Sequence, residues 1–189
     1  MSMHVQEVKQ MFLSTQMNSP LGTLTLAATS EAIVGLWIDG QKYWGLTKPE
    51  NFIREDAAPI LREGCAWLEA YFADKRPSID VLPLAPLGGT FRQTVWSILK
   101  EIPYGQVTTY GAVAAEAARR LGKERMSAQA TGGAVGHNQI SIIIPCHRVV
   151  GANGSLTGYA GGVDKKVALL RHEGADMSRL FIPKKGTAL

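Results

Sequence analysis

Alternating apolar and polar positions predict a small sheet near the start of the chain. Leu24, Leu26 and Ala28 alternate with threonines, the two-residue period of a strand with one buried face. A second apolar run covers residues 33–38 after a short polar break, so a hairpin is expected. Over residues 60–72 the apolar positions fall at steps of three and four, which predicts a helix packed on this sheet, with Cys65 as a small buried side chain.

The pattern changes after a stretch rich in proline and glycine. Residues 73–90 contain three prolines and two glycines, which is typical of a linker, and we place a domain boundary near Pro86. Beyond it, Phe91 to Leu99 has the apolar spacing of a helix that ends at a Pro-Tyr-Gly turn. A second helix is expected after Thr109.

Small residues fill the next predicted helix, residues 128–136. Two short helices joined by a polar turn that contains Arg125 are typical of a helix-turn-helix. Alanine and glycine on such a helix would either let its backbone approach a ligand or only allow close packing inside the protein, and the spacing leaves both open. A last amphipathic helix carries Val163 and Leu170 and ends at Gly174.

Composition and charge agree with a globular protein whose second half is basic. The 189 residues are 46% hydrophobic, enough for a buried core. Residues 1–85 contain 7 basic and 10 acidic side chains, whereas residues 86–189 contain 13 and 6. This asymmetry favours binding of a polyanion by the second half. No apolar run reaches the roughly 20 residues that span a membrane, and the first residues lack a signal-peptide pattern, so we expect a cytoplasmic protein.

One cysteine stands where chemistry is expected. Residues 140–144 form an apolar run of strand length, predicted to be a buried strand that ends at a proline, and Cys146 and His147 follow directly. Neighbouring histidine and arginine favour the nucleophilic thiolate. Adjacent side chains on an extended chain point apart, so His147 would act through a water. Glu173, at the end of the last predicted helix, is a candidate partner for this histidine.

Other kinds of site fit less well. A zinc site would need about four ligands, and the second cysteine, Cys65, has only His4 besides it in the first half. A cysteine peptidase uses a thiol, an imidazole and a carboxylate, but peptidases separate their cysteine and histidine widely in sequence. A DNA-binding regulator would fit the basic half but would not need Cys146.

The sequence Pro145-Cys146-His147-Arg148-Val149 strongly resembles the active-site motif of the O6-alkylguanine-DNA alkyltransferases, which repair DNA in a single turnover. Asn138, Tyr159-Ala160-Gly161-Gly162 and His172-Glu173-Gly174 lie at the spacing of that family. The close resemblance covers about residues 86–176. It implies a ribonuclease-H-like α/β domain over residues 1–85 and a mainly α, winged helix-turn-helix-like domain over residues 86–189.

The resemblance also implies the roles of individual residues. Cys146 is similar to the alkyl acceptor, and His147 to the base that takes its proton through a water. Glu173 would orient His147, Asn138 would brace the network, and Tyr110 would protonate the departing guanine. The residues that would contact DNA are Arg125, Gln129, Ala130, Gly133 and Arg148. The residues that would line the pocket for the flipped base are Val149, Tyr159, Ala160 and Gly161.

The chemistry of the family explains the thiol. Displacing an alkyl group from guanine O6 by attack at saturated carbon needs a soft nucleophile, and the thioether product is not cleaved again. Family members flip the damaged nucleotide out of the duplex. The expected partner is therefore double-stranded DNA that contains O6-alkylguanine, with O4-alkylthymine as a further lesion, bound by a monomer without cofactor or metal. Alkyltransferase-like proteins, which bind lesions without repairing them, are the alternative.

Three positions depart from the family. Gln129 stands where many members have an arginine that fills the gap left by the flipped base. About five extra residues lie between Tyr110 and Gln129, which brings Arg125 within reach of phosphate. Gln139 stands where a proline usually follows the asparagine, so a looser turn is expected there.

Overall fold

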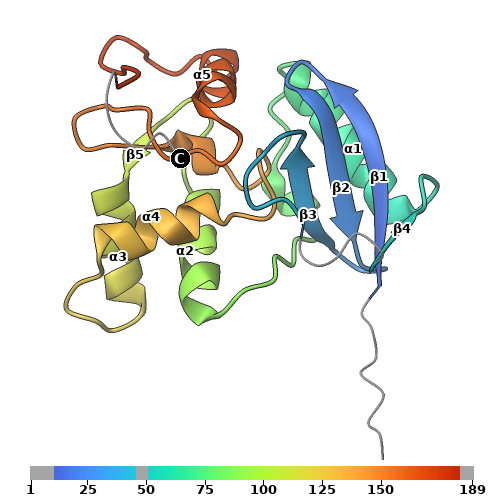
Figure 1. Cartoon of the computed structure of the whole chain (residues 1–189), viewed down its shortest axis with the longest axis horizontal. Coiled ribbons are helices and arrows are strands. Elements are labelled where there is room, and N and C mark those ends of the chain that lie inside the picture. Colours follow the sequence, from blue (N-terminus) through green and yellow to red (C-terminus); the bar gives the residue numbers. More distant parts are fainter. Residues whose placement is uncertain (1–10, 46–50, 184–189) are drawn as a thin grey trace, which may run out of the picture.

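The first part of the chain is a four-stranded sheet covered by a helix (Figure 1). The computed structural model describes residues 11–45 and 51–183, so His4 lies outside the described residues. The strand order is β3-β2-β1-β4, with β4 parallel to β1 and the other pairs antiparallel. The strands are β1 (Phe12–Ser19), β2 (Gly22–Ala28), β3 (Ile33–Ile38) and β4 (Phe52–Arg54). The predicted hairpin corresponds to β2 and β3.

Helix α1 (Pro59–Phe72) packs on the sheet through one apolar face. Proline at its first turn suits a position whose N–H has no helical partner. A side-chain carbon at Gly64 would lie 2.8 Å from Leu26 Cδ2, so glycine lets the helix approach the sheet closely. The predicted helix is confirmed. Cys65 is only half-buried, because the stripe facing the sheet is centred on Leu61, Gly64 and Leu68.

The second part is mainly helical. Helices α2, α3 and α4 pack on one another, and Trp96 of α2 donates its indole N–H to the carbonyl of Ala134 in α4 at 2.9 Å. Thr109 and Ser127 cap α3 and α4 through their hydroxyls. The elements are α2 (Thr90–Lys100), α3 (Tyr110–Arg120), α4 (Ala128–Gly136), α5 (Val163–His172), the short helices η2 (Ile79–Val81) and η3 (Cys146–Arg148), and the paired strands β5 (Thr108–Thr109) and β6 (Val149–Val150). The predicted fold class, an α/β domain followed by a mainly helical DNA-binding domain, is confirmed.

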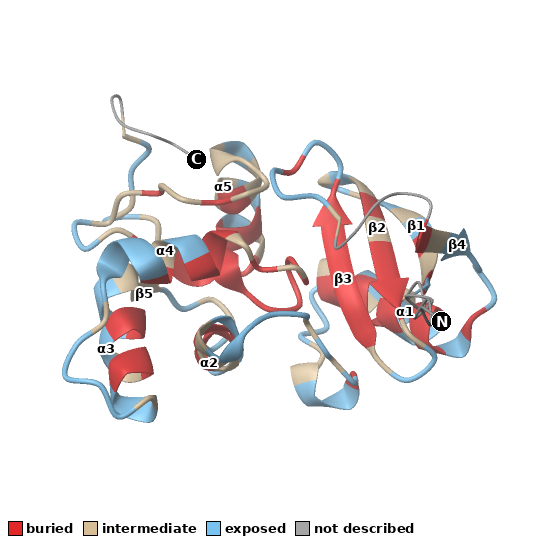
Figure 2. Ribbon diagram, turned by 60° about the horizontal axis from the view of Figure 1, so that its bottom comes forward, coloured by how far each residue is buried: buried red, intermediate tan, exposed pale blue. Residues whose placement is uncertain are grey.

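The two parts meet along the free edge of β3. The backbone N–H of Leu36 donates to the carbonyl of Gln139 at 2.8 Å, and the N–H of Ser141 donates to the carbonyl of Leu36 at 2.9 Å. One hydrophobic cluster includes Leu36 and Ile38 of β3 together with Val135 and Ile140, and Figure 2 shows β3 as buried. The boundary near Pro86 stays a prediction, since this core extends across it.

Residues 140–144 do not form the predicted strand. Ile140 makes a single bridge to Leu36, and the chain then turns tightly, with Ile143 N bonded to Ser141 O and Ile144 N to Ile140 O. Ile142 has a φ of 69°, a left-handed conformation that is unfavourable for a β-branched residue. The apolar side chains of this run are buried, and its compact turn leads through Pro145 to Cys146, which is buried as well.

Among residues 11–45 and 51–183, no helix is both long and apolar enough to cross a membrane.

Candidate active site

The Cys146 thiol lies inside the protein and is held by an amide. Cys146 is only 4% exposed, and it begins η3, with Pro145 between it and the turn of residues 140–144. Asn138 Nδ2 donates to Cys146 Sγ at 3.2 Å and to the carbonyl of Ile144 at 2.8 Å, while Asn138 Oδ1 accepts from the N–H of Ile140 at 3.1 Å. The asparagine thus contacts both the turn and the sulfur. Gln139, next to it, uses its side-chain Oε1 to accept from the N–H of Leu87 at 2.9 Å.

His147 and Glu173 form a buried pair. His147 Nε2 lies 2.7 Å from Glu173 Oε1, and both side chains are fully buried. A carboxylate accepts hydrogen bonds, so Nε2 carries the proton and Nδ1 holds a free lone pair. Nδ1 has no hydrogen-bond partner in the part of the chain that the structure describes. Burial lowers the pKa of His147, against the opposing effect of Glu173, so the ring is neutral and Nδ1 is available as a base.

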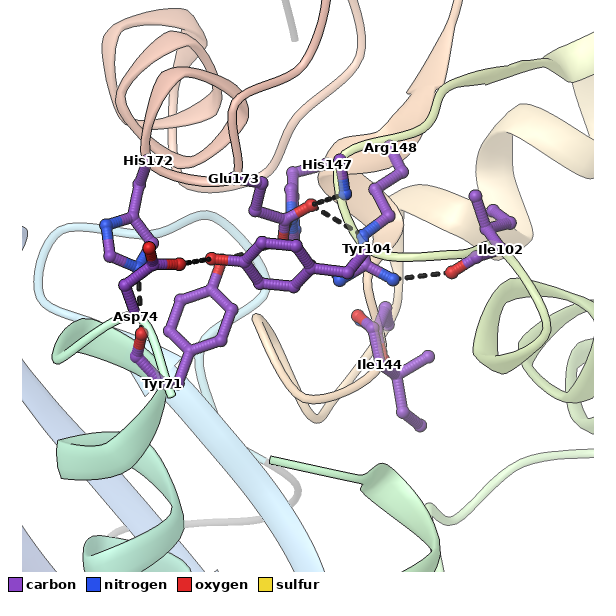
Figure 3. A network of polar contacts seen from close by, with 11 residues as sticks. Tyr71, Asp74, Ile102, Tyr104, Ile144, His147, Arg148, His172 and Glu173 are labelled. Carbon is purple, nitrogen blue, oxygen red and sulfur yellow. Dashed lines mark hydrogen bonds and ion pairs between the residues drawn. The ribbon is translucent and has the colours of Figure 1, made fainter. Parts of the chain in front are cut away.

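Arg148 does not lie on the surface, contrary to its predicted contact with DNA. Its guanidinium binds both oxygens of Glu173, with Nε to Oε2 at 2.8 Å and Nη2 to Oε1 at 2.9 Å, and it donates to the carbonyl of Ile102 at 2.5 Å. The residue is 5% exposed, and its guanidinium also lies over the Tyr104 ring. The buried carboxylate, 25 residues away in sequence, explains the correction: Arg148 neutralises it from inside the protein (Figure 3).

Glu173 is the centre of this network. Its carboxylate accepts five hydrogen bonds, from Tyr71, Gly105, His147 and twice from Arg148. Burial opposes ionisation, but the hydrogen bonds and charges of His147 and Arg148 outweigh it and hold the pKa of Glu173 well below its usual range. Gly105 has a φ of 73°, and a side-chain carbon there would lie 2.7 Å from the Glu173 carbonyl. Only glycine lets the turn before β5 come this close.

Tyr110 and Lys166 are two further groups that interact electrostatically with Cys146. The Tyr110 hydroxyl is 3.0 Å from the carbonyl of Thr157 and 3.1 Å from that of Gly158. Burial and the neighbouring Cys146 raise the pKa of Tyr110. Lys166 is fully buried and donates to the carbonyls of Val149 at 2.6 Å and Thr157 at 2.8 Å. Burial lowers the pKa of Lys166 to about 8.

Among the residues expected to line a base pocket, Val149 and Ala160 have carbonyls that accept hydrogen bonds from Lys166 and Lys42. Val149 is fully buried, and its carbonyl is fixed by Lys166. Tyr159 is 2% exposed, and its hydroxyl lies near the Ser141 side chain but makes no hydrogen bond of ordinary geometry within the described residues. Ala160 and Gly161 are partly exposed, and the carbonyl of Ala160 accepts from the N–H of Lys42 at 2.9 Å. A loop from the first part of the chain therefore borders this region.

The remaining residues expected at DNA share the open face of α4 and the turn before it. Arg125, Gln129, Ala130 and Gly133 are all exposed. The opposite face of α4 is buried through Thr131, Ala134 and Val135, as Figure 2 shows. A side-chain carbon at Gly132 would lie 3.9 Å from the Tyr110 ring. The small-residue helix is thus both packed on one side and open on the other, next to Tyr110.

Sequence reasoning missed two residues of this site. Lys166 occupies the apolar stripe of α5, three residues after Val163 and four before Leu170. A lysine at such a position is a recognisable signal, because lysine is almost never fully buried without a specific partner. Tyr71 gave no signal, since it reads as one more apolar position of α1.

Family models and curated proteins that match this chain belong to one family. Residues 13–86 match the family description "6-O-methylguanine DNA methyltransferase, ribonuclease-like domain", and residues 90–175 match "6-O-methylguanine DNA methyltransferase, DNA binding domain". The chain is 44% identical over 158 residues to a methylated-DNA–protein-cysteine methyltransferase of Methanosarcina acetivorans, covering 83% of this chain and 95% of that protein. A protein of the same name from Haemophilus influenzae is 36% identical over 155 residues, 82% of each chain.

A solved structure is also similar. The crystal structure of Mycobacterium tuberculosis OGT in complex with DNA superposes with a TM-score of 0.73 at 37% identity, covering 89% of this chain and 94% of the other. These matches define the class of protein, a DNA-repair protein that accepts an alkyl group on its own cysteine. The chain belongs to the 6-O-methylguanine DNA methyltransferase family. Its activity is direct DNA repair by transfer of an alkyl group to a cysteine of the protein.

Proposed function

We propose that Cys146 is the alkyl acceptor and that O6-alkylguanine in double-stranded DNA is the substrate. The observation that carries this proposal is the chain of contacts from Asn138 to Cys146 and from His147 to Glu173. It supplies a held thiol, a neutral base with a free nitrogen and a charged carboxylate that orients the base. Cys65 lacks all three.

Activation of the thiol would proceed through His147. Burial raises the pKa of Cys146, while the Asn138 amide and the Lys166 charge act in the opposite direction. The resting group is therefore a thiol that must lose its proton during the reaction. His147 Nδ1 makes no direct hydrogen bond to Sγ, so a water would relay the proton from Sγ to Nδ1, and Glu173 would stabilise the resulting imidazolium.

The transfer step then needs no cofactor. The thiolate attacks the alkyl carbon, the sulfur–carbon bond forms as the bond from carbon to guanine O6 breaks, and the electron pair stays on the base. Tyr110, whose raised pKa keeps its hydroxyl protonated beforehand, would donate a proton to the departing guanine and would be reprotonated from solvent, while His147 would release to solvent the proton taken from the thiol. The product is a thioether on Cys146 and unmodified guanine, so each molecule would act once.

Recognition of the base would use the groups around Lys166. The candidate residues are Val149, Tyr159, Ala160 and Gly161, and the carbonyls of Val149 and Ala160 are held by the Lys166 ammonium and the Lys42 N–H. The buried Tyr159 hydroxyl, which lies near Ser141 but makes no well-formed hydrogen bond within the described residues, could bind the flipped base. Flipping costs a few kcal/mol, and least for a damaged pair. O4-alkylthymine, which offers a similar alkyl oxygen, is a further candidate substrate.

DNA would bind along the open face of α4. Ala130 and Gly133 leave room for close approach of a groove, Gln129 would occupy the gap in the base stack, and Arg125 would contact phosphate. Arg148 is no longer part of this set. The contacts of Asn138 with Cys146 and of His147 with Glu173 form without a second copy, which supports our proposal that a monomer acts, in the cytoplasm, where a reducing environment keeps Cys146 as a thiol.

The test is mass measurement after mixing equimolar protein with a duplex carrying one O6-methylguanine. We expect the protein to gain the mass of one methylene, confined to the peptide that contains Cys146, and Cys146→Ser to gain none. A matched Cys65→Ser variant should react like the unsubstituted protein. Tight binding without mass gain would instead identify a lesion-sensing protein, and modification of Cys65 would refute the assignment of Cys146.

A further inference from the structure

A tyrosine of the sheet-bearing half reaches the centre of the reaction network. Tyr71 lies in the last turn of α1, is 1% exposed, and places its hydroxyl 2.7 Å from Glu173 Oε1 (Figure 3). The carboxylate of Glu173 is the sole acceptor for this hydroxyl within the described part of the chain. The contact joins residues 102 positions apart in sequence.

Tyr71 shares its acceptor with the base. Oε1 of Glu173 also binds His147 Nε2 at 2.7 Å and Arg148 Nη2 at 2.9 Å. Burial and the charge of Glu173 raise the pKa of Tyr71, so its hydroxyl remains a donor. Hydrogen bonds to a charged acceptor are short and strong. Each donor on Oε1 reduces the electron density that the oxygen offers to the others, so Tyr71 weakens the attraction of Glu173 for a proton on His147.

The end of α1 also contacts His172, the residue before Glu173. His172 Nε2 lies 2.8 Å from the carbonyl of Tyr71, and the rings of the two residues lie 5.1 Å apart. Tyr71 therefore contacts α5 through its backbone, its ring and its hydroxyl. This arrangement fixes the position of the Glu173 carboxylate relative to α1.

We propose that Tyr71 is a positioning residue for alkyl transfer, which orients Glu173 and limits how strongly Glu173 retains a proton on His147. The ribonuclease-like half would thereby contribute a side chain to the chemistry of the other half. The proposal rests on the proposed role of His147 as the base. The titratable and charged groups around this pair are Tyr71 on α1, Tyr104 on the turn before β5, Cys146 and Arg148 on η3, Tyr159 on the loop before α5, and Lys166 and His172 on α5.

The test removes one hydroxyl at a time. Tyr71→Phe deletes the donor to Glu173 and keeps the ring. Tyr104→Phe is the matched control, because its hydroxyl binds Asp74 at 3.2 Å and not Glu173, while its ring packs against Tyr71. Single-turnover methyl transfer from the duplex is measured from pH 8 downward. We expect the transfer rate of Tyr71→Phe to begin to fall at a higher pH than that of the unsubstituted protein. On the acid side its rate should be about three- to tenfold lower than that of the unsubstituted protein. At pH 8 the two rates should be similar.

A second readout does not depend on DNA. In Tyr71→Phe the Nε2 proton of His147 should move downfield in the NMR spectrum, because Oε1 has one donor fewer, and Tyr104→Phe should leave it in place. An unchanged resonance and pH profile would refute the positioning role, as would equal changes in both variants or a rate loss of the same size at every pH. Failure of the unsubstituted protein to transfer methyl would refute the proposed function, while the resonance would still decide the role of Tyr71.

Discussion

Replacing Glu173 by glutamine would remove the charge that holds the network together. Arg148, 5% exposed, would keep only the carbonyl of Ile102 as an acceptor besides the amide oxygen of the new glutamine. Removing one partner of a buried ion pair costs about 3 to 5 kcal/mol. In a protein of this size each kcal/mol lowers Tm by about 2 to 4 °C. We therefore expect Glu173→Gln to lower Tm at pH 7 by about 6 to 20 °C, measured by circular dichroism.

Glu116→Gln is the matched control. Glu116 pairs with Arg119 and Arg120 on the surface of α3, where ion pairs contribute little. Its replacement should change Tm only slightly. Because the pKa of Glu173 is lowered on folding, its contribution is present above the unfolded pKa of about 4.3. It is lost as the pH falls below that value, so the difference between the unsubstituted protein and Glu173→Gln should shrink in acid. Equal effects of the two substitutions at pH 7, or a difference independent of pH, would refute this account.

Three further outcomes follow from the site. Asn138→Ala removes the amide donor to the Cys146 thiol and to the Ile144 carbonyl, and it removes the acceptor of the buried N–H of Ile140, so transfer should slow at least about tenfold and unfolding should become easier by about 2 to 4 kcal/mol in urea titrations. Lys166→Met removes a charge that lowers the pKa of Cys146; alkylation of Cys146 by iodoacetamide, followed by peptide mass, should then require a higher pH. Gln129→Arg adds a cation on the open face of α4, so duplex binding should tighten and become more sensitive to salt; an unchanged rate and affinity would show that Gln129 does not limit the grip on DNA.

Local periodicity was sufficient to predict most of the helices. Helices α2, α3 and α5 show apolar residues at helical spacing, and threonine or glycine marks their ends. Strand β1 was missed because most of its residues are polar or only half-buried. For residues 140–144 the predicted strand was wrong for the opposite reason. A continuous apolar segment is typical of a buried strand, but here tight turns take the place of hydrogen bonds to a neighbouring strand.

The charged interior could not be predicted from the sequence. Arg148 looked like a surface residue, because a lone arginine gives no sign of a carboxylate 25 residues further on. Tyr71 could not be linked to Glu173 by any local pattern, since packing of α1 against α5 brings them together. The motif predicted that Cys146, His147 and Glu173 act together, whereas the structure adds which atoms of these side chains make hydrogen bonds.

The contacts of strand β3 with later parts of the chain determine where the protein can be cut into fragments. The outer edge of β3 is covered by two segments that belong to the rest of the chain, at Ile33 by Leu84 and at Leu36 by Ile140. A fragment that ended near Ile79 would lack both of these covering segments. The outer edge of β3 and the apolar side chains around it would then face the solvent. Exposed apolar edges pair with other chains. We expect such a fragment to self-associate into β-rich aggregates, so attempts to express the halves separately or to fuse a new domain at this point should retain residues 82–85 and supply a substitute for residues 139–141.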